Sequence, residues 1–199
     1  MKLVVATDIF GITTELVEWL RPIAESLNLE LELVSPYPAT VASTMEGQLA
    51  PVVPSSEEHA YQNFLKHGGL ELYSKKLQHC FESQSQAFSA LGFSAGAAVI
   101  WRVAATSSSS IKQAFCFYGG QIRLNSDLQP QVPTTLIWAQ ESHFDVDALH
   151  QQLRQYPYMN SIVTTYAHGF INPLSAGFHQ EAASHYQHLL IEMLMLGAE

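Results

Sequence analysis

A serine between two glycines, in the GFSAG stretch Gly92–Gly96, constrains the fold of this chain more than any other feature. The mostly apolar run Ala87–Leu91 before it is typical of a short buried strand, and Ala95–Ala105 after it is typical of a helix. A serine on the sharp turn between such a strand and helix is lifted clear of the sheet, and the flanking glycines have no Cβ to clash with that turn. The pattern predicts that Ser94 is a nucleophile, and the alternative is an ordinary strand-to-helix turn.

The rest of the chain alternates between strand-like and helix-like segments. Apolar runs predict strands at Leu3–Asp8, Ala114–Tyr118, Thr134–Ala139 and Ile162–Tyr166. Leu29–Val34 alternates Leu and Glu, which predicts a strand nearer the edge of the sheet with one face more exposed to water than the other. Helical spacing of apolar residues predicts helices from about residue 14 to Leu27, and over Glu57–Lys66, Leu70–Phe81, Asp145–Arg154 and Gln180–Leu196. This alternation indicates one α/β domain over residues 1–199. We expect a doubly wound, mostly parallel sheet of about six strands, with helices on both faces and ligands at the carboxyl ends of the strands.

Charge and composition exclude several classes of partner. The formal net charge is -9, and the few Lys and Arg residues are scattered, whereas nucleic acids and anionic membranes require clustered positive charge. No apolar run reaches the roughly 18 residues of a membrane span, and the N-terminus lacks a signal-peptide pattern, so we expect a cytoplasmic protein. Cys80 and Cys116 fall in a predicted helix and a predicted strand, which suits unpaired thiols in a reducing compartment. The oligomeric state stays open.

Polar residues follow several predicted strands directly, and these are Asp8, Ser94, Tyr118, Glu141 and His168. The carboxyl ends of parallel strands meet at one edge of a sheet, so these side chains are expected to converge. The chain order of serine, acid and histidine is that of the α/β-hydrolase triad. We therefore predict that His168 takes the Ser94 proton and returns it to the leaving group, and the alternative is a surface histidine.

Four motifs together resemble the dienelactone hydrolase family of α/β-hydrolases. They are Asp8–Gly11, Gly92–Gly96, Phe117–Gly120 and His168–Phe170, and they appear in the family's order with similar spacing over almost the whole chain. The resemblance implies an α/β-hydrolase fold with a minimal cap. It also implies that the backbone amides of Ile9 and Ala95 form the oxyanion hole, and that Asp8 matches an acidic position beside the nucleophile. Since Ala95 also begins a predicted helix, its amide lies where negative charge is favoured.

The chain departs from the family pattern at three places. Ser94 stands where dienelactone hydrolase itself has a cysteine, which moves the expected substrate from dienelactones toward simpler esters. The stretch Gly169–Ala183 contains no Lys or Arg, whereas the family enzyme holds a substrate carboxylate with arginines, so an anionic substrate is not expected. Ser142 occupies the position of the family's catalytic aspartate.

The third departure leaves two candidates for the acid that orients His168. Glu141 and Asp145 both lie in the correct loop, and the acid must reach the imidazole Nδ1. Asp145 has an alternative role as the N-cap of the following helix. His185 and His188 share a helix face but have no third ligand in the sequence, so we predict no metal site.

These observations predict a serine hydrolase that needs no cofactor and cleaves a small ester or related acyl compound through an acyl-enzyme. Its partner would be a small-molecule acyl substrate of unknown identity. The alternative is a non-catalytic α/β-hydrolase-fold protein that binds a small molecule or a protein partner, because the fold alone carries many functions. The absence of an acid at position 142 is the feature that favours this alternative.

Overall fold

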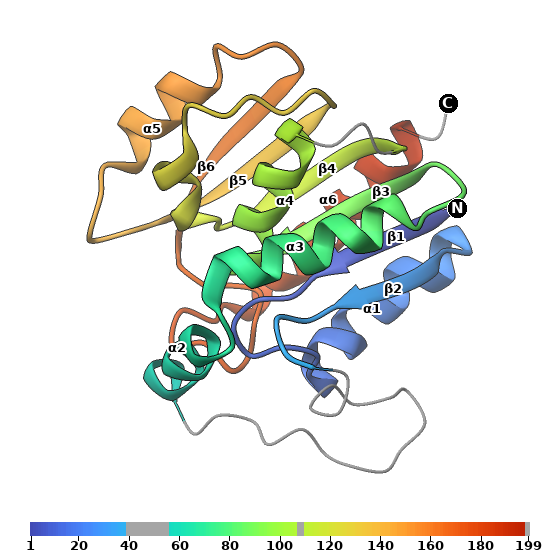
Figure 1. Cartoon of the computed structure of the whole chain (residues 1–199). Helices are drawn as coiled ribbons and strands as arrows, with labels where there is room; N and C mark the ends of the chain where they lie inside the picture. Colours follow the sequence, from blue (N-terminus) through green and yellow to red (C-terminus); the bar gives the residue numbers. More distant parts are fainter. Residues whose placement is uncertain (39–55, 107–109, 198–199) are drawn as a thin grey trace.

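The computed structural model of the chain describes residues 1–38, 56–106 and 110–197. Its centre is a six-stranded sheet, which can be followed in Figure 1. All neighbouring strands are parallel, in the order β2-β1-β3-β4-β5-β6. The strands are β1 Lys2–Ala6, β2 Glu30–Val34, β3 Phe88–Phe93, β4 Ile111–Phe117, β5 Thr134–Gln140 and β6 Met159–Ala167. The helices are α1 Thr14–Leu27, α2 Glu57–Lys66, α3 Gly69–Glu82, α4 Ala95–Thr106, the short 3₁₀ helix η1 Gly120–Asn125, α5 Val146–Leu153 and α6 Gln180–Leu196. The predicted α/β class is confirmed.

Helices cover both faces of the sheet, α1 and α6 on one face and α3, α4 and α5 on the other (Figure 1). Strand β1 shows why both faces must be covered, because Val4 and Ala6 pack toward α4 while Leu3 and Val5 pack toward α1 and α6. All four side chains are fully buried. A parallel strand covered on both faces is a continuous apolar run, which is the pattern that predicted it.

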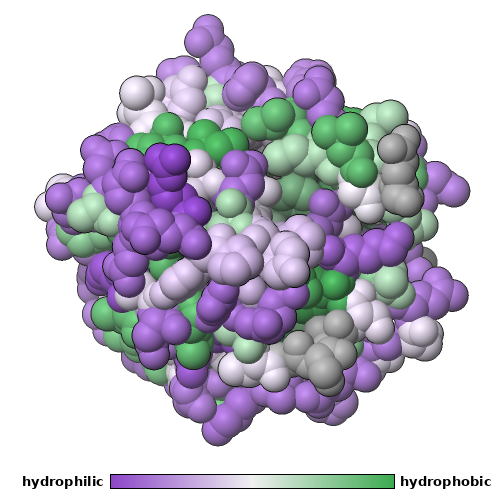
Figure 2. Space-filling view, turned by 90° about the horizontal axis from the view of Figure 1, so that it is seen from above, coloured by the Kyte–Doolittle hydropathy of each residue, from purple (hydrophilic) through white to green (hydrophobic). Residues whose placement is uncertain are grey.

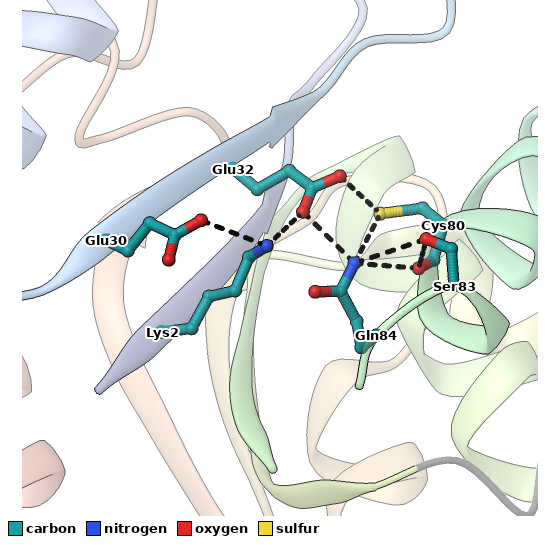
Figure 3. A network of polar contacts seen from close by, with 6 residues as sticks. All are labelled: Lys2, Glu30, Glu32, Cys80, Ser83 and Gln84. Carbon is teal, nitrogen blue, oxygen red and sulfur yellow. Dashed lines mark hydrogen bonds and ion pairs between the residues drawn. The ribbon is translucent and has the colours of Figure 1, made fainter. Parts of the chain in front are cut away.

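The β2 edge of the sheet carries a polar network (Figure 3). Lys2 Nζ lies 3.2 Å from a Glu30 carboxylate oxygen and 2.7 Å from one of Glu32. The Cys80 thiol and the Gln84 amide, at the end of α3 and just beyond it, donate to Glu32 over 3.1 and 3.0 Å. The alternation of Leu and Glu predicted an edge strand with one wetter face, and the position of β2 confirms it.

The opposite edge strand, β6, begins three residues earlier than the predicted Ile162. Asn160 and Ser161 are polar, so the sequence alone gives this part of the strand no apolar pattern. In the structure Ser161 Oγ accepts a hydrogen bond from Trp138 Nε1 at 2.9 Å and lies 2.7 Å from His150 Nδ1. Met159, at the start of the strand, packs against the hydrophobic core.

Hydrophilic and hydrophobic side chains are interspersed on the face of the molecule seen in Figure 2. The large apolar side chains that are exposed among the described residues come from several elements, including Leu72 of α3, Leu124 of η1 and Leu196 of α6. No helix in the described part of the chain is long and apolar enough to cross a lipid bilayer. The polar residues predicted to form the active site follow the carboxyl ends of the strands, and these are Asp8, Ser94, Glu141 and His168.

Candidate active site

Ser94 lies on a tight turn between β3 and α4 and has a left-handed backbone, with φ of 52°. Non-glycine residues adopt this conformation rarely, and such strain is concentrated at functional sites. The two glycines of the motif make the turn possible. A Cβ on Gly92 would lie 2.7 Å from Ala97 N, and a Cβ on Gly96 would lie 2.1 Å from the Ala6 carbonyl oxygen. Larger residues at these positions would push α4 away from β3 and β1.

Three side chains from three different loops form a continuous hydrogen-bonded chain. Ser94 Oγ lies 2.8 Å from His168 Nε2, and His168 Nδ1 lies 2.6 Å from Glu141 Oε1. Ser94 follows β3, Glu141 follows β5, and His168 follows β6. The parallel sheet therefore brings together residues that are 74 and 27 positions apart in sequence.

The surroundings of the imidazole define its tautomer. An ionised Glu141 carboxylate has no proton to donate and acts only as a hydrogen-bond acceptor. The proton of a neutral His168 ring therefore lies on Nδ1, which faces this carboxylate. Nε2 is then free to accept the Ser94 hydroxyl proton. The Glu141 side chain is only 7% exposed, whereas that of His168 is 40% exposed. The other Glu141 oxygen lies 3.6 Å from Nδ1 of the exposed His143.

Asp145, the other candidate acid, has a different environment. It is the N-cap of α5, and its carboxylate accepts a hydrogen bond from Ala148 N at 2.9 Å. The residue is exposed, and no ion pair joins it to His168 among the described residues. The fold thus brings Glu141 to the imidazole and leaves Asp145 in its capping role.

Ile9 and Ala95, whose backbone amides were predicted to form the oxyanion hole, line the same cleft as Ser94. Neither N–H has a hydrogen-bond acceptor within the described ranges. Ala95 is the first residue of α4, where backbone N–H groups point out of the helix and attract negative charge. Two unpaired donors from two strand ends form an arrangement that can stabilise an oxyanion.

Asp8, just after β1, is a second acid near His168. Its carboxylate accepts hydrogen bonds from Phe10 N at 2.9 Å and from Asn172 Nδ2 at 2.6 Å. Burial raises the pKa of Asp8 from the usual 3.8 to about 6, although these two bonds and the nearby His168 act in the opposite direction. Asp8 is therefore bound by neutral amide donors, whereas Glu141 is bound by the imidazole.

The cleft in front of Ser94 has a volume of about 340 Å³. Besides the residues predicted from the sequence, it is lined by Glu57, Glu58 and Tyr61 of α2 and by Arg123 of η1. Arg123 donates to the Gly120 carbonyl oxygen at 2.7 Å and lies over the Phe144 ring. The prediction about cations rested on the loop after His168 and did not include Arg123, because a short 3₁₀ turn has no periodic pattern in the sequence.

Metal-ligating side chains do not gather elsewhere in the described part of the chain. No group of three or more His, Cys, Asp or Glu residues there could hold a metal ion. Of the two histidines on α6, His188 bonds through Nδ1 to the Ser184 carbonyl oxygen at 2.8 Å, and His185 packs its ring against Tyr186.

Several solved structures share this fold at low sequence identity. A putative dienelactone hydrolase from Klebsiella pneumoniae subsp. pneumoniae has a TM-score of 0.67 and 17% identity, with 95% of this chain and 84% of that chain covered. A dienelactone hydrolase from Anabaena variabilis has a TM-score of 0.61 and 17% identity, with coverage of 98% and 85%. A dienelactone hydrolase-like promiscuous phosphotriesterase from metagenomic libraries has a TM-score of 0.61 and 16% identity, with coverage of 96% and 84%. These likenesses confirm the α/β-hydrolase fold.

No curated protein sequence matches the chain. The family model described as "Dienelactone hydrolase family" does match it, over residues 2–195. This match includes all four motifs that carried the resemblance, from Asp8 to Phe170. The chain therefore belongs to the dienelactone hydrolase family of hydrolases.

Proposed function

We propose that the protein is a serine hydrolase that cleaves a small ester or related acyl compound through an acyl-enzyme. The observation that carries this proposal is the continuous chain from Ser94 through His168 to Glu141, with bonds of 2.8 and 2.6 Å. The two unpaired amides of Ile9 and Ala95 beside it support the same chemistry.

The proposed acylation step follows from these positions. Ser94 Oγ attacks the acyl carbonyl carbon while His168 Nε2 takes the hydroxyl proton, and Glu141 holds the imidazolium through Nδ1. The carbonyl electron pair moves onto oxygen, where the N–H groups of Ile9 and Ala95 stabilise the negative charge. The intermediate collapses, the bond to the leaving group breaks, and His168 gives the proton to the leaving oxygen.

Deacylation repeats the sequence with water as the nucleophile. His168 Nε2 takes a proton from water, whose oxygen attacks the acyl carbon, and the same two amides hold the second oxyanion. When the second intermediate collapses, the bond to Ser94 Oγ breaks and His168 returns the proton to it. None of these steps requires a metal or an organic cofactor.

The charge of the cleft guides the choice of substrate. The acidic side chains of Asp8, Glu57, Glu58 and Glu141 line it, and its only permanently cationic lining residue among those described is Arg123. We therefore expect short neutral esters to be hydrolysed faster than carboxylate-bearing esters of equal size. The measurement is the ratio of kcat/KM for the two ester series, and a preference for the anionic series would point to Arg123 as its anchor.

Labelling with a fluorophosphonate tests the nucleophile directly. Intact-mass analysis of the treated protein is expected to show one adduct, which peptide mapping assigns to Ser94. Ser94→Ala serves as the negative control and is expected to remain unlabelled while folded. Absence of labelling in the wild type, or labelling of another serine, would contradict the proposed function and favour a non-catalytic binding protein.

A further inference from the structure

One hydrogen bond joins the two loops that carry the oxyanion-hole residue Ile9 and the base His168. It runs from Asn172 Nδ2 to Asp8 Oδ2 over 2.6 Å and spans 164 residues of sequence. No sequence motif singles out Asn172. In the structure the loop after β6 lies beside the end of β1, and this brings Asn172 to Asp8.

Further bonds extend this contact on both sides. On the side of β1, Asp8 Oδ1 accepts from Phe10 N at 2.9 Å and thereby holds the turn that contains Ile9. On the side of β6, the Asn172 backbone N–H donates to the Gly169 carbonyl oxygen at 2.8 Å. The turn closed by that bond begins immediately after His168. A continuous path of hydrogen bonds therefore connects the Ile9 turn to the His168 loop.

Asn172 is also fixed through its other side-chain atom. Asn172 Oδ1 accepts a hydrogen bond from Leu174 N at 2.9 Å. The amide thus uses its oxygen toward its own loop and its nitrogen toward Asp8. Both ends of the bond are oriented by their own backbone, so a change in either loop is transmitted to the other.

The Asp8 carboxylate has an electrostatic influence as well. Among the described residues it has no ion-pair partner, and its two hydrogen-bond donors are neutral. His168 is the nearby group whose positive charge interacts favourably with it. When His168 gains the Ser94 proton, the resulting imidazolium is therefore attracted by Asp8 as well as by Glu141.

We propose that Asp8 and Asn172 are a pair of positioning residues for the proposed hydrolase. Their hydrogen bond sets the separation between the Ile9 amide and the His168 imidazole. Both groups act on the same transition state, so their relative position decides how well both interactions are made at once. Displacements of about 1 Å in such groups lower rates about 10²-fold. This inference rests on the proposed function.

A side-chain swap tests the pair. In the Asp8→Asn variant the side chain has one acceptor oxygen, whereas Phe10 N and Asn172 Nδ2 both donate to the Asp8 carboxylate in the wild type. One of these two donors then faces the NH₂ group of the introduced amide. Asn172→Asp alone puts two carboxylates against each other. The double variant Asp8→Asn/Asn172→Asp restores the bond with reversed polarity, because the introduced amide donates to the introduced carboxylate. The introduced groups also keep acceptors for Phe10 N and Leu174 N.

We expect each single variant to lower kcat about 10-fold to 100-fold, with a much smaller change in KM. The double variant is expected to recover most of that loss. The second-order rate of fluorophosphonate labelling should follow the same order, since it depends on the same serine, histidine and amides. Asp147→Asn is the matched control, because it makes the same chemical change at an exposed position on α5 and should leave both rates unchanged.

Thermal melting separates loss of positioning from loss of folding, and Asn172→Ala provides a variant that removes the bond without adding a charge. Folded single variants with wild-type kcat would overturn the inference. So would a double variant no faster than the slower single one. In both cases labelling of the wild type at Ser94 would leave the proposed function standing, whereas an unlabelled wild type would overturn the two together.

Discussion

Two carboxylates flank His168, and the comparison between them shows how one chemical group acquires different roles. The Glu141 carboxylate forms a hydrogen bond of 2.6 Å with the His168 imidazole. The Asp8 carboxylate accepts hydrogen bonds of 2.9 and 2.6 Å from two amide donors. Both follow strands of one parallel sheet, Glu141 after β5 and Asp8 after β1, and each of these strands is the second from an edge of the sheet. The partner, rather than the acid itself, decides whether the group works with the base or holds a loop.

The largest expected effect comes from removing the charge of Glu141. Glu141→Gln is expected to lower kcat several hundred-fold to about 10⁴-fold, because the amide neither holds the correct tautomer nor stabilises the imidazolium. Steady-state rates on one aryl ester measure the effect, with thermal melting as the folding control. Asp145→Asn is the matched variant in the same loop and is expected to keep the wild-type rate. If Asp145→Asn loses activity while Glu141→Gln keeps it, then Asp145, and not Glu141, is the acid that orients His168.

A smaller effect is expected from the buried charge of Asp8, and it concerns stability. The folded-state pKa of about 6 lies above the usual 3.8, so burial favours the protonated form. The stabilisation from protonated Asp8 is complete below about pH 3.8 and is lost as the pH rises through about 6, a difference of about 3 kcal/mol. Asp8→Asn removes this dependence. The free energy of unfolding of wild type minus that of Asp8→Asn should therefore fall between pH 4 and 8.

Urea unfolding of both proteins at several pH values measures this difference. The amide also loses one hydrogen bond, which shifts the whole curve but not its slope with pH. Asp147→Asn, at an exposed position, controls for a general change in net charge. Parallel curves for wild type and Asp8→Asn would show that Asp8 titrates like an exposed carboxyl, and the contrast with Glu141 would then need another explanation.

The smallest effect is expected at Asp145, which belongs to neither side of the comparison. Asp145→Ala is expected to lower the free energy of unfolding by about 1 kcal/mol, because the Ala148 N–H loses its capping acceptor. Hydrolysis rates should not change. Asp145→Asn retains a good capping side chain and should restore the stability. A loss of activity in Asp145→Ala at temperatures where it remains folded would bring Asp145 back as an acid.

The fold and the serine turn were predictable because each depends on local patterns. Buried parallel strands are short apolar runs, and the glycines around Ser94 reflect a close approach of α4 to β1 that no Cβ allows. The first strand was predicted to reach Asp8, but it ends at Ala6, because Asp8 accepts the bond that turns the chain at Phe10. A side chain that caps a loop resembles a strand residue when only the sequence is known.

The acid and its surroundings depend on distances between loops, which the sequence does not contain. Glu141 and Asp145 are four positions apart in one loop, and both can reach a histidine in a chain whose loop path is unknown. The structure separates them because Asp145 starts α5 and Glu141 points back toward His168. Asn172 was missed for a related reason, since an amide in a loop has no periodic signature.

The environment of the two cysteines bears on how the nucleophile can be studied. Burial, with the bond to Glu32 as a lesser cause, raises the pKa of Cys80 to about 12, and burial raises the pKa of Cys116 still further. Thiolates are the reactive form, so alkylating reagents should react slowly with both at neutral pH. A Ser94→Cys variant would then carry one accessible, imidazole-activated thiol. Because the two native thiols react slowly, a spectroscopic probe could be attached at position 94 alone, inside the cleft, without replacing Cys80 or Cys116.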